Sequence, residues 1–295
     1  TRCLSDWSSD VCSSDLVLFW NKSMFDREGL PNLYDIFFNY EWTWDKMLEF
    51  AKKLTKDTDG DGVIDQWGIG GAAQRLERAL VISNNAHYID ISDKDHPKFA
   101  LTTPNAIEAL QMHQDLILKH RVVSMTPEGA PWDYNVQAFI EGKIGMLVGQ
   151  IWKIDRIKEN MQDEYGIVLF PMGPKAKEYT SELTGHFVRT IPITVKNPKE
   201  VAIVENAMTE PYPDEGPDDW REYYELRVTD EESIKTVEMI WDKQLSVFNL
   251  QWAFGIDDIF YTIEYEVMTG SKTPTAAVEE YAQEAQMRIN DALKL

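Results

Sequence analysis

Hydrophobic and polar positions change their period twice between residues 134 and 150. Val136, Phe139 and Ile140 recur at helical spacing, and Gly142 follows where a helix would end. The apolar run at residues 144–148 is too short for a buried helix and suits a strand that is covered on both faces. The pattern predicts a short helix followed by a buried strand, with a turn at Gly149-Gln150.

The same alternation continues to residue 174. Apolar residues return at helical spacing over 151–161, and a second apolar run over 165–170 ends at Pro171. Together these segments predict a strand–helix–strand unit. Ligands of such sheets lie beyond the carboxyl ends of the strands, which is where Gln150 and Trp152 stand in the sequence. We therefore expect these two side chains at a binding site.

Comparable patterns along the chain predict an α/β protein. The helix expected after Thr43 has its apolar stripe at residues 44, 47, 48, 51 and 54, and Trp42 and Met47 occupy hydrophobic-staple positions. The remaining elements are predicted as strands at 17–21 and 186–195, helices at 22–30, 75–83, 104–119, 198–208, 234–241 and 274–292, and an exposed acidic loop at 209–219.

Residues 57–68, DTDGDGVIDQWG, have the spacing of a calcium-binding loop, with Gly62 at the sharp turn. Gly68 stands at the twelfth position, where an EF-hand has a bidentate glutamate. We predict a structural calcium ion here, and a solvated Asp-Gly turn is the alternative. The candidate ligands from the spacing are Asp57, Asp59, Asp61, the carbonyl of Val63, and Asp65.

The segment that follows, Gly68 to Ala73, fits the pattern G-x-G-x-x-A of dinucleotide-binding turns. The strand before it is short and the acidic loop directly precedes it, so phosphate would meet a negative neighbourhood. We instead interpret these small residues as allowing backbone and helix to approach closely.

Composition narrows the function classes. The 295 residues are 43% hydrophobic, which is enough for one large or two ordinary domains. Fifty acidic against 29 basic residues give a net charge of −21. This charge repels nucleic acid and anionic lipid surfaces, and no apolar run reaches the roughly eighteen residues that span a bilayer. We expect a globular protein with no nucleic-acid partner.

Residues 1–16 differ from the rest of the chain. They are rich in Ser and Asp, lack a period and contain both cysteines, Cys3 and Cys12. We interpret them as the translation of a sequencing adapter and expect no structure there, and a genuine disordered tail is the alternative. The rest of the chain has no cysteine, which excludes a structural disulfide and a cysteine-based metal site in that part.

Catalytic motifs are absent from the sequence. A glycoside hydrolase needs aromatic residues and carboxylates, and this chain has many of both, so sugar cleavage is an alternative to sugar binding without catalysis. The five histidines form no H-E-x-x-H motif, and no G-x-S-x-G motif is present. We expect no enzyme activity and no catalytic cofactor.

The phrase AFIEGKIGMLVGQIW, residues 138–152, resembles a signature of the extracellular solute-binding proteins of ABC importers, the carbohydrate-binding type. The resemblance covers residue 17 to the end. It implies a two-lobed, type II periplasmic-binding-protein-like α/β fold whose first lobe is incomplete in this sequence. Residues 17–180 would form most of lobe II, 186–245 the remaining part of lobe I, and 246–295 would return to lobe II.

Function and partners follow from the same resemblance. It implies a monomer that captures a sugar or oligosaccharide between its lobes and delivers it to the ABC permease in the membrane. The location would be extracytoplasmic, either periplasmic or lipid-anchored to the outer face of the cytoplasmic membrane, with signal and anchor outside this sequence. In some of these proteins a similar loop holds calcium with a ligand at its tenth position, which here is Gln66.

The resemblance also implies a ligand site. An aromatic residue just after the 144–150 strand commonly stacks on a sugar ring in this family, and Trp152 stands there. The alternative is a buried Trp152 at a helix start, as large aromatics are mostly buried. Trp44 has the same alternative. The candidate ligand-binding residues are Gln150, Trp152, Trp132, Trp44, Asn84 and Arg189.

Overall fold

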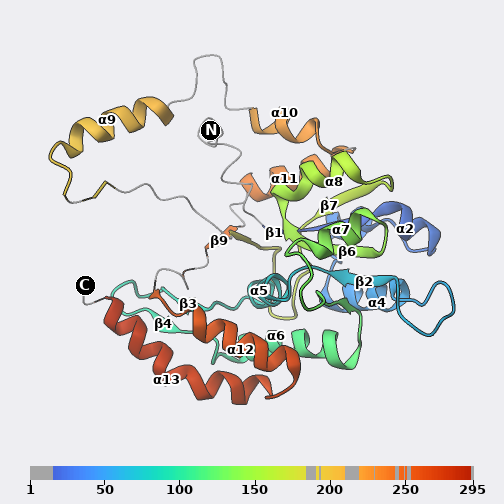
Figure 1. Cartoon of the computed structure of the whole chain (residues 1–295), viewed down its shortest axis with the longest axis horizontal. Helices are drawn as coiled ribbons and strands as arrows, with labels where there is room; N and C mark the ends of the chain where they lie inside the picture. Colours follow the sequence, from blue (N-terminus) through green and yellow to red (C-terminus); the bar gives the residue numbers. More distant parts are fainter. Residues whose placement is uncertain are drawn as a thin grey trace.

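The structure is a computed structural model that describes residues 16–183, 191–192, 194–209, 219–228, 230–242, 246–248, 250 and 254–293. Within these residues a five-stranded sheet forms the centre of the larger part of the molecule (Figure 1). The strand order is β5-β2-β6-β1-β7. The strands are β1 Leu16–Asn21, β2 Trp67–Gly70, β5 Val123–Ser124, β6 Ile144–Gln150 and β7 Tyr165–Val168.

The strand–helix–strand unit predicted for residues 144–170 is confirmed. Strand β6 leads through the short 3-10 helix η2 (Ile151–Lys153) and helix α8 (Ile154–Asn160) to β7. Strand β1 lies between β6 and β7 and runs antiparallel to both, with Phe19 opposite Leu147 and Ile167. The turn predicted at Gly149-Gln150 is wrong, because both residues continue β6 and pair with β1.

Strands β2, β5 and β6 are parallel, so their carboxyl ends meet at one edge of the sheet. Ile69 of β2 pairs with Val123 on one side and with Met146 on the other. Every residue of β1 and β6 is buried, which is the burial expected for apolar strands with helices on both faces. The helices around this sheet are α2 (Lys22–Arg27), α3 (Leu33–Phe38), α4 (Trp44–Leu54), α7 (Tyr134–Ile140), α8, α10 (Asp219–Glu225) and α11 (Glu231–Asp242).

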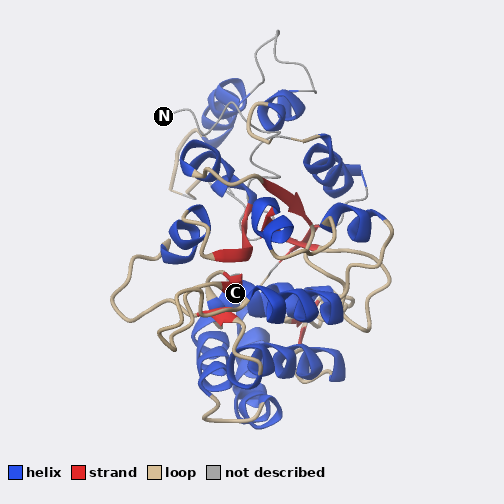
Figure 2. Cartoon of the chain, turned by 90° about the vertical axis from the view of Figure 1, so that its right-hand side faces the viewer, coloured by secondary structure: helices blue, strands red, loops and turns tan. Residues whose placement is uncertain are grey.

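A second group of helices packs on itself beside the sheet. Helices α12 and α13 run side by side next to α5 and α6 (Figures 1 and 2). Phe260 of α12 contacts the rings of Tyr88 and Phe99, which lie in the segment between α5 and α6. The elements of this group are α5 (Ala73–Ser83), β3 (Ile89–Asp90), β4 (Lys98–Phe99), α6 (Pro104–Gln114) with its π-helical extension η1 (Asp115–Lys119), α12 (Asp257–Thr269) and α13 (Pro274–Ala292).

Helix boundaries depart from the predictions at a few points. The helix expected over 22–30 ends at Arg27, because Gly29 adopts a φ of +65° and Leu30 N donates to Phe25 O. Thr43 precedes α4 as expected, but its side chain makes no capping bond, and its carbonyl accepts from Met47 N instead. Helix α12 was not predicted at all.

The region after residue 180 has fewer described contacts. A two-stranded parallel sheet joins β8 (Ser181–Leu183) and β9 (Ser246–Phe248). Of the strand predicted over 186–195, residues 186–190 and 193 lie outside the described part, and Val195 N donates to Pro192 O in a turn. The predicted loop at 209–219 also lies almost wholly outside it.

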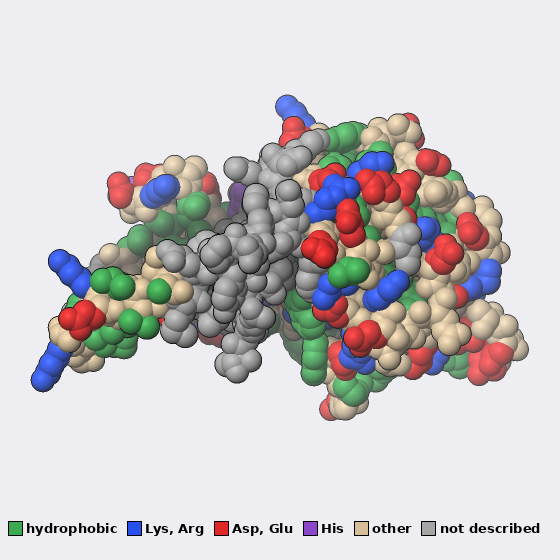
Figure 3. All heavy atoms as spheres, turned by 90° about the horizontal axis from the view of Figure 1, so that it is seen from above, with side chains coloured by type: hydrophobic (Ala, Val, Ile, Leu, Met, Phe, Trp, Pro, Cys, Tyr) green, Lys and Arg blue, Asp and Glu red, His purple; other side chains and the backbone are tan. Residues whose placement is uncertain are grey.

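Helix α9 (Pro198–Thr209) stands away from the central sheet (Figure 1). Its apolar residues Val201, Ile203 and Val204 are exposed, and the left part of Figure 3 shows hydrophobic side chains beside charged ones. The larger part of the molecule shows acidic and basic side chains interspersed on the same face.

Candidate functional site

A cavity of about 560 Å³ opens at the carboxyl edge of the parallel strands. Three connections that leave this edge contribute to its wall: the β2–α5 turn, the segment after β5, and the end of β6 with η2. Helix α7 and helix α12 complete it. This is the position at which open α/β sheets bind ligands.

The β2–α5 turn brings backbone close to β6. Gly71 has a φ of +144°, and a Cβ atom built on it would lie 2.7 Å from the carbonyl oxygen of Val148. Only glycine fits there, which agrees with the interpretation of this small-residue segment as a close approach. The turn passes directly into α5, so Arg75 and Arg78 project from its first two turns into the cavity wall.

Asn135 of α7 holds two of these connections together. Its side-chain amide donates to Gly71 O and to Thr126 Oγ1, both at 3.0 Å. Asn135 is buried, as is Gln150 at the end of β6, and both line the cavity. The wall therefore offers fixed amide groups of the kind that orient polar ligands.

Two tryptophans lie together at the cavity. The ring centroids of Trp132 and Trp152 are 6.2 Å apart, with the planes tilted by 41°. Trp132 is 73% exposed and lines the cavity, and Trp152 is 42% exposed. Lys153 Nζ lies 5.3 Å from the first ring centroid and 5.0 Å from the second, within cation–π range of both.

Lys153 is buried, although the two tryptophan rings beside its ammonium group are exposed. Burial, followed by repulsion from Arg75, lowers the pKa of Lys153 to about 8. Burial also lowers the pKa of Arg75 to about 10, with repulsion from Arg78 as the second cause. The cavity wall thus holds several cations that are partly withdrawn from water.

Helix α12 supplies the opposite wall through Tyr261, Glu264 and Met268. Burial, followed by repulsion from Glu77, raises the pKa of the Glu264 carboxyl. None of these residues was predicted, because α12 itself was missed. The signal was present: Ile259, Phe260, Ile263 and Val267 recur at helical spacing, and Gly270 follows as a left-handed cap with a φ of +72°.

The six predicted ligand-binding residues do not all meet. Gln150 and Trp132 line the cavity, and Trp152 contacts Trp132. Trp44 is buried elsewhere and its Nε1 donates to Ser83 Oγ at 3.0 Å. Asn84 is also buried, donates to Asn105 O and accepts from Lys175 N. Neither of these two lines the cavity, and Arg189 lies outside the described residues.

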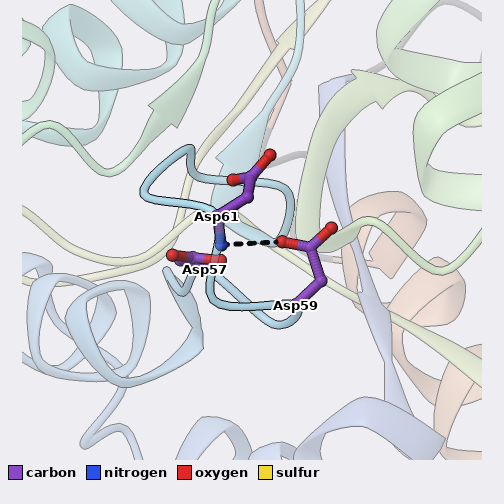
Figure 4. A group of neighbouring side chains, drawn as sticks. All are labelled: Asp57, Asp59 and Asp61. Atoms are coloured by element: carbon purple, nitrogen blue, oxygen red, sulfur yellow. Dashed lines mark hydrogen bonds between the residues drawn. The ribbon is translucent and has the colours of Figure 1, made fainter.

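The predicted calcium loop lies on the surface, away from the cavity. Carboxylate oxygens of Asp57, Asp59 and Asp61 come within 4.8 Å of one another (Figure 4). Asp57 accepts from the backbone N–H groups of Gly60 and Gly62 at 2.7 Å, which curls the loop. Three carboxylates offer the hard oxygen ligands that a calcium ion prefers.

The other predicted calcium ligands have different neighbours. Asp65 accepts from the backbone N–H and the hydroxyl of Thr58, and Val63 N donates to Asp61. The side-chain amide of Gln66 donates to Leu54 O and turns toward the protein. The carbonyl of Val63 and the carboxylate of Asp65 stay predictions as ligands, and so does Gln66.

Three solved structures share the fold. An ABC transporter solute-binding protein from Thermotoga lettingae, bound with alpha-D-tagatose, matches with a TM-score of 0.65 at 20% identity, over 95% of this chain and 70% of that one. The maltose/maltodextrin-binding domain MalE from Bdellovibrio bacteriovorus, bound to maltotriose, matches with a TM-score of 0.64 at 17% identity, over 96% of this chain and 71% of that one. UgpB from Mycobacterium tuberculosis, in complex with glycerophosphocholine, matches with a TM-score of 0.67 at 13% identity, over 94% of this chain and 69% of that one.

These matches confirm the predicted two-lobed periplasmic-binding-protein-like fold. The predicted lobe boundaries stay predictions. No curated protein matches the chain. Among the described residues, no helix has both the length and the apolar character needed to cross a membrane.

The sequence profile of the bacterial extracellular solute-binding proteins matches residues 6–209, more than half of the chain. The resemblance found in residues 138–152 is thereby confirmed. Proteins of this family bind a solute without converting it, which excludes the glycoside hydrolase alternative. The chain belongs to the bacterial extracellular solute-binding proteins, the family that captures solutes for ABC importers.

Proposed function

We propose that the solute is a carbohydrate, and that the cavity at the carboxyl edge of β2, β5 and β6 contributes its binding surface. The observation that carries this proposal is the exposed pair Trp132 and Trp152 at a cavity with amide-bearing walls. A flat aromatic face suits the apolar face of a sugar ring, while amide groups suit its hydroxyls. The sugars bound by the Thermotoga and Bdellovibrio proteins support this choice.

The contrast with the other tryptophans strengthens the argument. Trp20, Trp42 and Trp44 are buried, and the last two donate their Nε1 hydrogen to an acceptor. Large exposed aromatic surface is unusual in a monomer and marks interaction sites. Two adjacent exposed tryptophans beside a cavity therefore indicate a ligand that covers them.

Delivery to an ABC permease, a monomeric state and a periplasmic or lipid-anchored location belong to the same proposal. They follow from the family, whose members act outside the cytoplasm. We also propose that the loop of Asp57, Asp59 and Asp61 takes a structural calcium ion, because its carboxylates converge.

The test is calorimetric titration of the chain with a panel of mono- and oligosaccharides, followed by mass spectrometry of the sugar. We expect saturable binding of one sugar class and recovery of the sugar intact. Absence of binding by any sugar would contradict the proposal. The same titration with the Trp132→Ala variant locates the site, since a sugar that binds it equally well occupies another surface.

A further inference from the structure

The charges that line the cavity have the opposite sign to the protein as a whole. The chain carries a net charge of −21, yet the charged residues of the described cavity wall are three cations and one carboxyl group. The cations are Arg75, Arg78 and Lys153, and the carboxyl belongs to Glu264. Burial raises the pKa of that carboxyl, which reduces the negative charge it can offer them.

Two of the three cations have no anionic partner within the described part of the chain. Arg78 lies 3.8 Å from a carboxylate oxygen of Glu182. Arg75 makes no hydrogen bond or ion pair there and feels the Glu182 carboxylate only from beyond ion-pair distance. The ammonium group of Lys153 has no hydrogen bond or ion pair there either and lies over the two tryptophan rings. Asp133, the acidic group near Lys153, is instead paired with Arg156.

Several surface cations of the protein have anionic partners. Arg221 on the surface reaches three glutamates, and Lys272 reaches two. The other described cations without an ion pair, such as Lys52 and Lys158, are exposed to water, whereas Arg75 is half-buried and Lys153 is buried. Unpaired cations at a cavity, partly withdrawn from water, are costly unless a ligand supplies the missing negative charge.

The backbone adds to the same field. Arg75 stands in the first turn of α5, an 11-residue helix, and the N-terminal end of a helix carries partial positive charge. A cation is unfavourable at this end and an anion is favourable. The arginine and the helix end therefore both attract a negative group to the cavity.

The tryptophans fix where that group lies on the ligand. Lys153 Nζ lies about equally far from both ring centroids, at 5.3 and 5.0 Å. Because the ammonium group lies over the faces of both rings, a ligand that covers the tryptophans also approaches this group. A negative group on the sugar that covers the tryptophans would therefore lie close to Lys153.

We propose that the solute is an acidic sugar, one with a carboxylate, phosphate or sulfate group that meets Arg75 and Lys153. This rests on the proposed carbohydrate function and names the class of carbohydrate. A guanidinium group binds carboxylate and phosphate oxygens alike through paired N–H donors, so the test separates these sources.

The experiment titrates the full chain with sugars that are matched except for charge. Galacturonate oligomers are compared with galactose oligomers. Glucuronate is compared with glucose and with the methyl ester of glucuronate. Glucose 6-phosphate and glucose 6-sulfate are each compared with glucose. We expect the acidic member to bind about 10- to 100-fold more tightly, as hydrogen bonds to charged groups allow. Which acid is preferred identifies the source of the charge.

Variants tie the preference to the residues. Arg75→Gln and Lys153→Gln should each reduce the affinity for the acidic member about tenfold or more and change the neutral member little. Arg75→Lys keeps the charge and should retain most of the preference. Lys158→Gln, an exposed cation on α8, is the matched control and should change neither affinity. Melting temperatures of all variants verify that they are folded.

The outcomes are separable. If the neutral sugar binds as tightly as its acidic partner, or if Arg75→Gln and Lys153→Gln leave the preference unchanged, the acidic-sugar inference is wrong while carbohydrate binding stands. If no sugar of either kind binds, the proposed function falls and takes this inference with it.

Discussion

Tryptophan is buried in the core of the sheet and exposed at the cavity. In the sheet core, Trp20 is 2% exposed and its ring contacts Phe25 and Tyr34 at 5.0 and 5.2 Å in edge-on geometry. At the cavity, Trp132 and Trp152 are exposed and contact a lysine. The core tryptophan is positioned by packing, whereas the cavity pair gains little from the fold and is available to a ligand.

Basic residues show the same contrast. Arg221 on the surface is paired with three glutamates, while the half-buried Arg75 and the buried Lys153 at the cavity have no ion pair among the described residues. The comparison teaches that the proposed solute-binding groups are those whose interactions the fold leaves incomplete.

The largest effect is expected from the core. Trp20→Ala should lower the free energy of unfolding by about 3–5 kcal/mol, because it leaves a cavity between β1, α2 and α3. Trp132→Ala should change it by less than about 0.5 kcal/mol, since its ring is already exposed. Urea denaturation followed by circular dichroism measures both. Equal losses in the two variants would remove the distinction between the regions.

Lys153→Met should stabilise the ligand-free protein by about 1–3 kcal/mol, because a buried charge without an ionic partner is replaced by an apolar chain of similar length. The gain should depend on pH. The folded-state pKa of Lys153 is lowered from 10.5 to about 8, first by burial and second by Arg75. Between these values the unfolded chain holds the proton more tightly, so wild-type stability rises with pH relative to the variant.

The measurement is the difference in unfolding free energy between the wild type and Lys153→Met from pH 7 to pH 10.5. It should be fully present below pH 8 and shrink as pH rises toward 10.5. Lys158→Met, on the exposed face of α8, is the control and should show no such trend. A pH-independent difference would show that Lys153 carries no burial penalty.

Trp152→Ala should reduce sugar affinity by about 1–3 kcal/mol, by analogy with other aromatic stacking platforms, while stability changes little. Tyr265→Ala is the matched control, because Tyr265 is a 63% exposed aromatic on α12 that does not line the cavity. Titration calorimetry with the sugar identified for the wild type gives both affinities. An unchanged affinity for Trp152→Ala would place the ring outside the binding surface.

The calcium loop has the opposite charge to the cavity wall, since it brings the carboxylates of Asp57, Asp59 and Asp61 together. Calcium at ten times its dissociation constant should stabilise the fold by about 1.4 kcal/mol. Thermal unfolding with calcium and with EDTA measures the shift. Asp59→Asn should abolish it, and Asp95→Asn, in another exposed loop, should not. Identical melting curves with and without calcium would favour the solvated-turn alternative.

Local periodicity was sufficient for much of the fold. The burial of β6, the strand–helix–strand unit and the closing helix α13 follow from runs and stripes of apolar residues that lie close together in the sequence. The rule that ligands meet the carboxyl ends of strands led to Gln150 and Trp152. Helix α12 also had a clear apolar stripe, and its omission removed Tyr261 and Glu264 from the predicted site.

Other site features have no signal in the sequence. Trp44 and Trp132 each stand near a helix start, yet one is buried against Ser83 and the other is exposed at the cavity. Arg75 and Lys153 are 78 positions apart and meet because β2 and β6 are neighbouring parallel strands. Their lack of partners is a property of what surrounds them in space.

The sequence by itself determined the class of fold, the family and the edge of the sheet at which to look, because period, turn residues and short motifs are local. The tertiary structure decided which aromatic residues are exposed, which cations are unpaired and which helix closes the cavity. Burial and charge pairing depend on residues that are distant in the chain and adjacent in space, so only the folded arrangement could decide them.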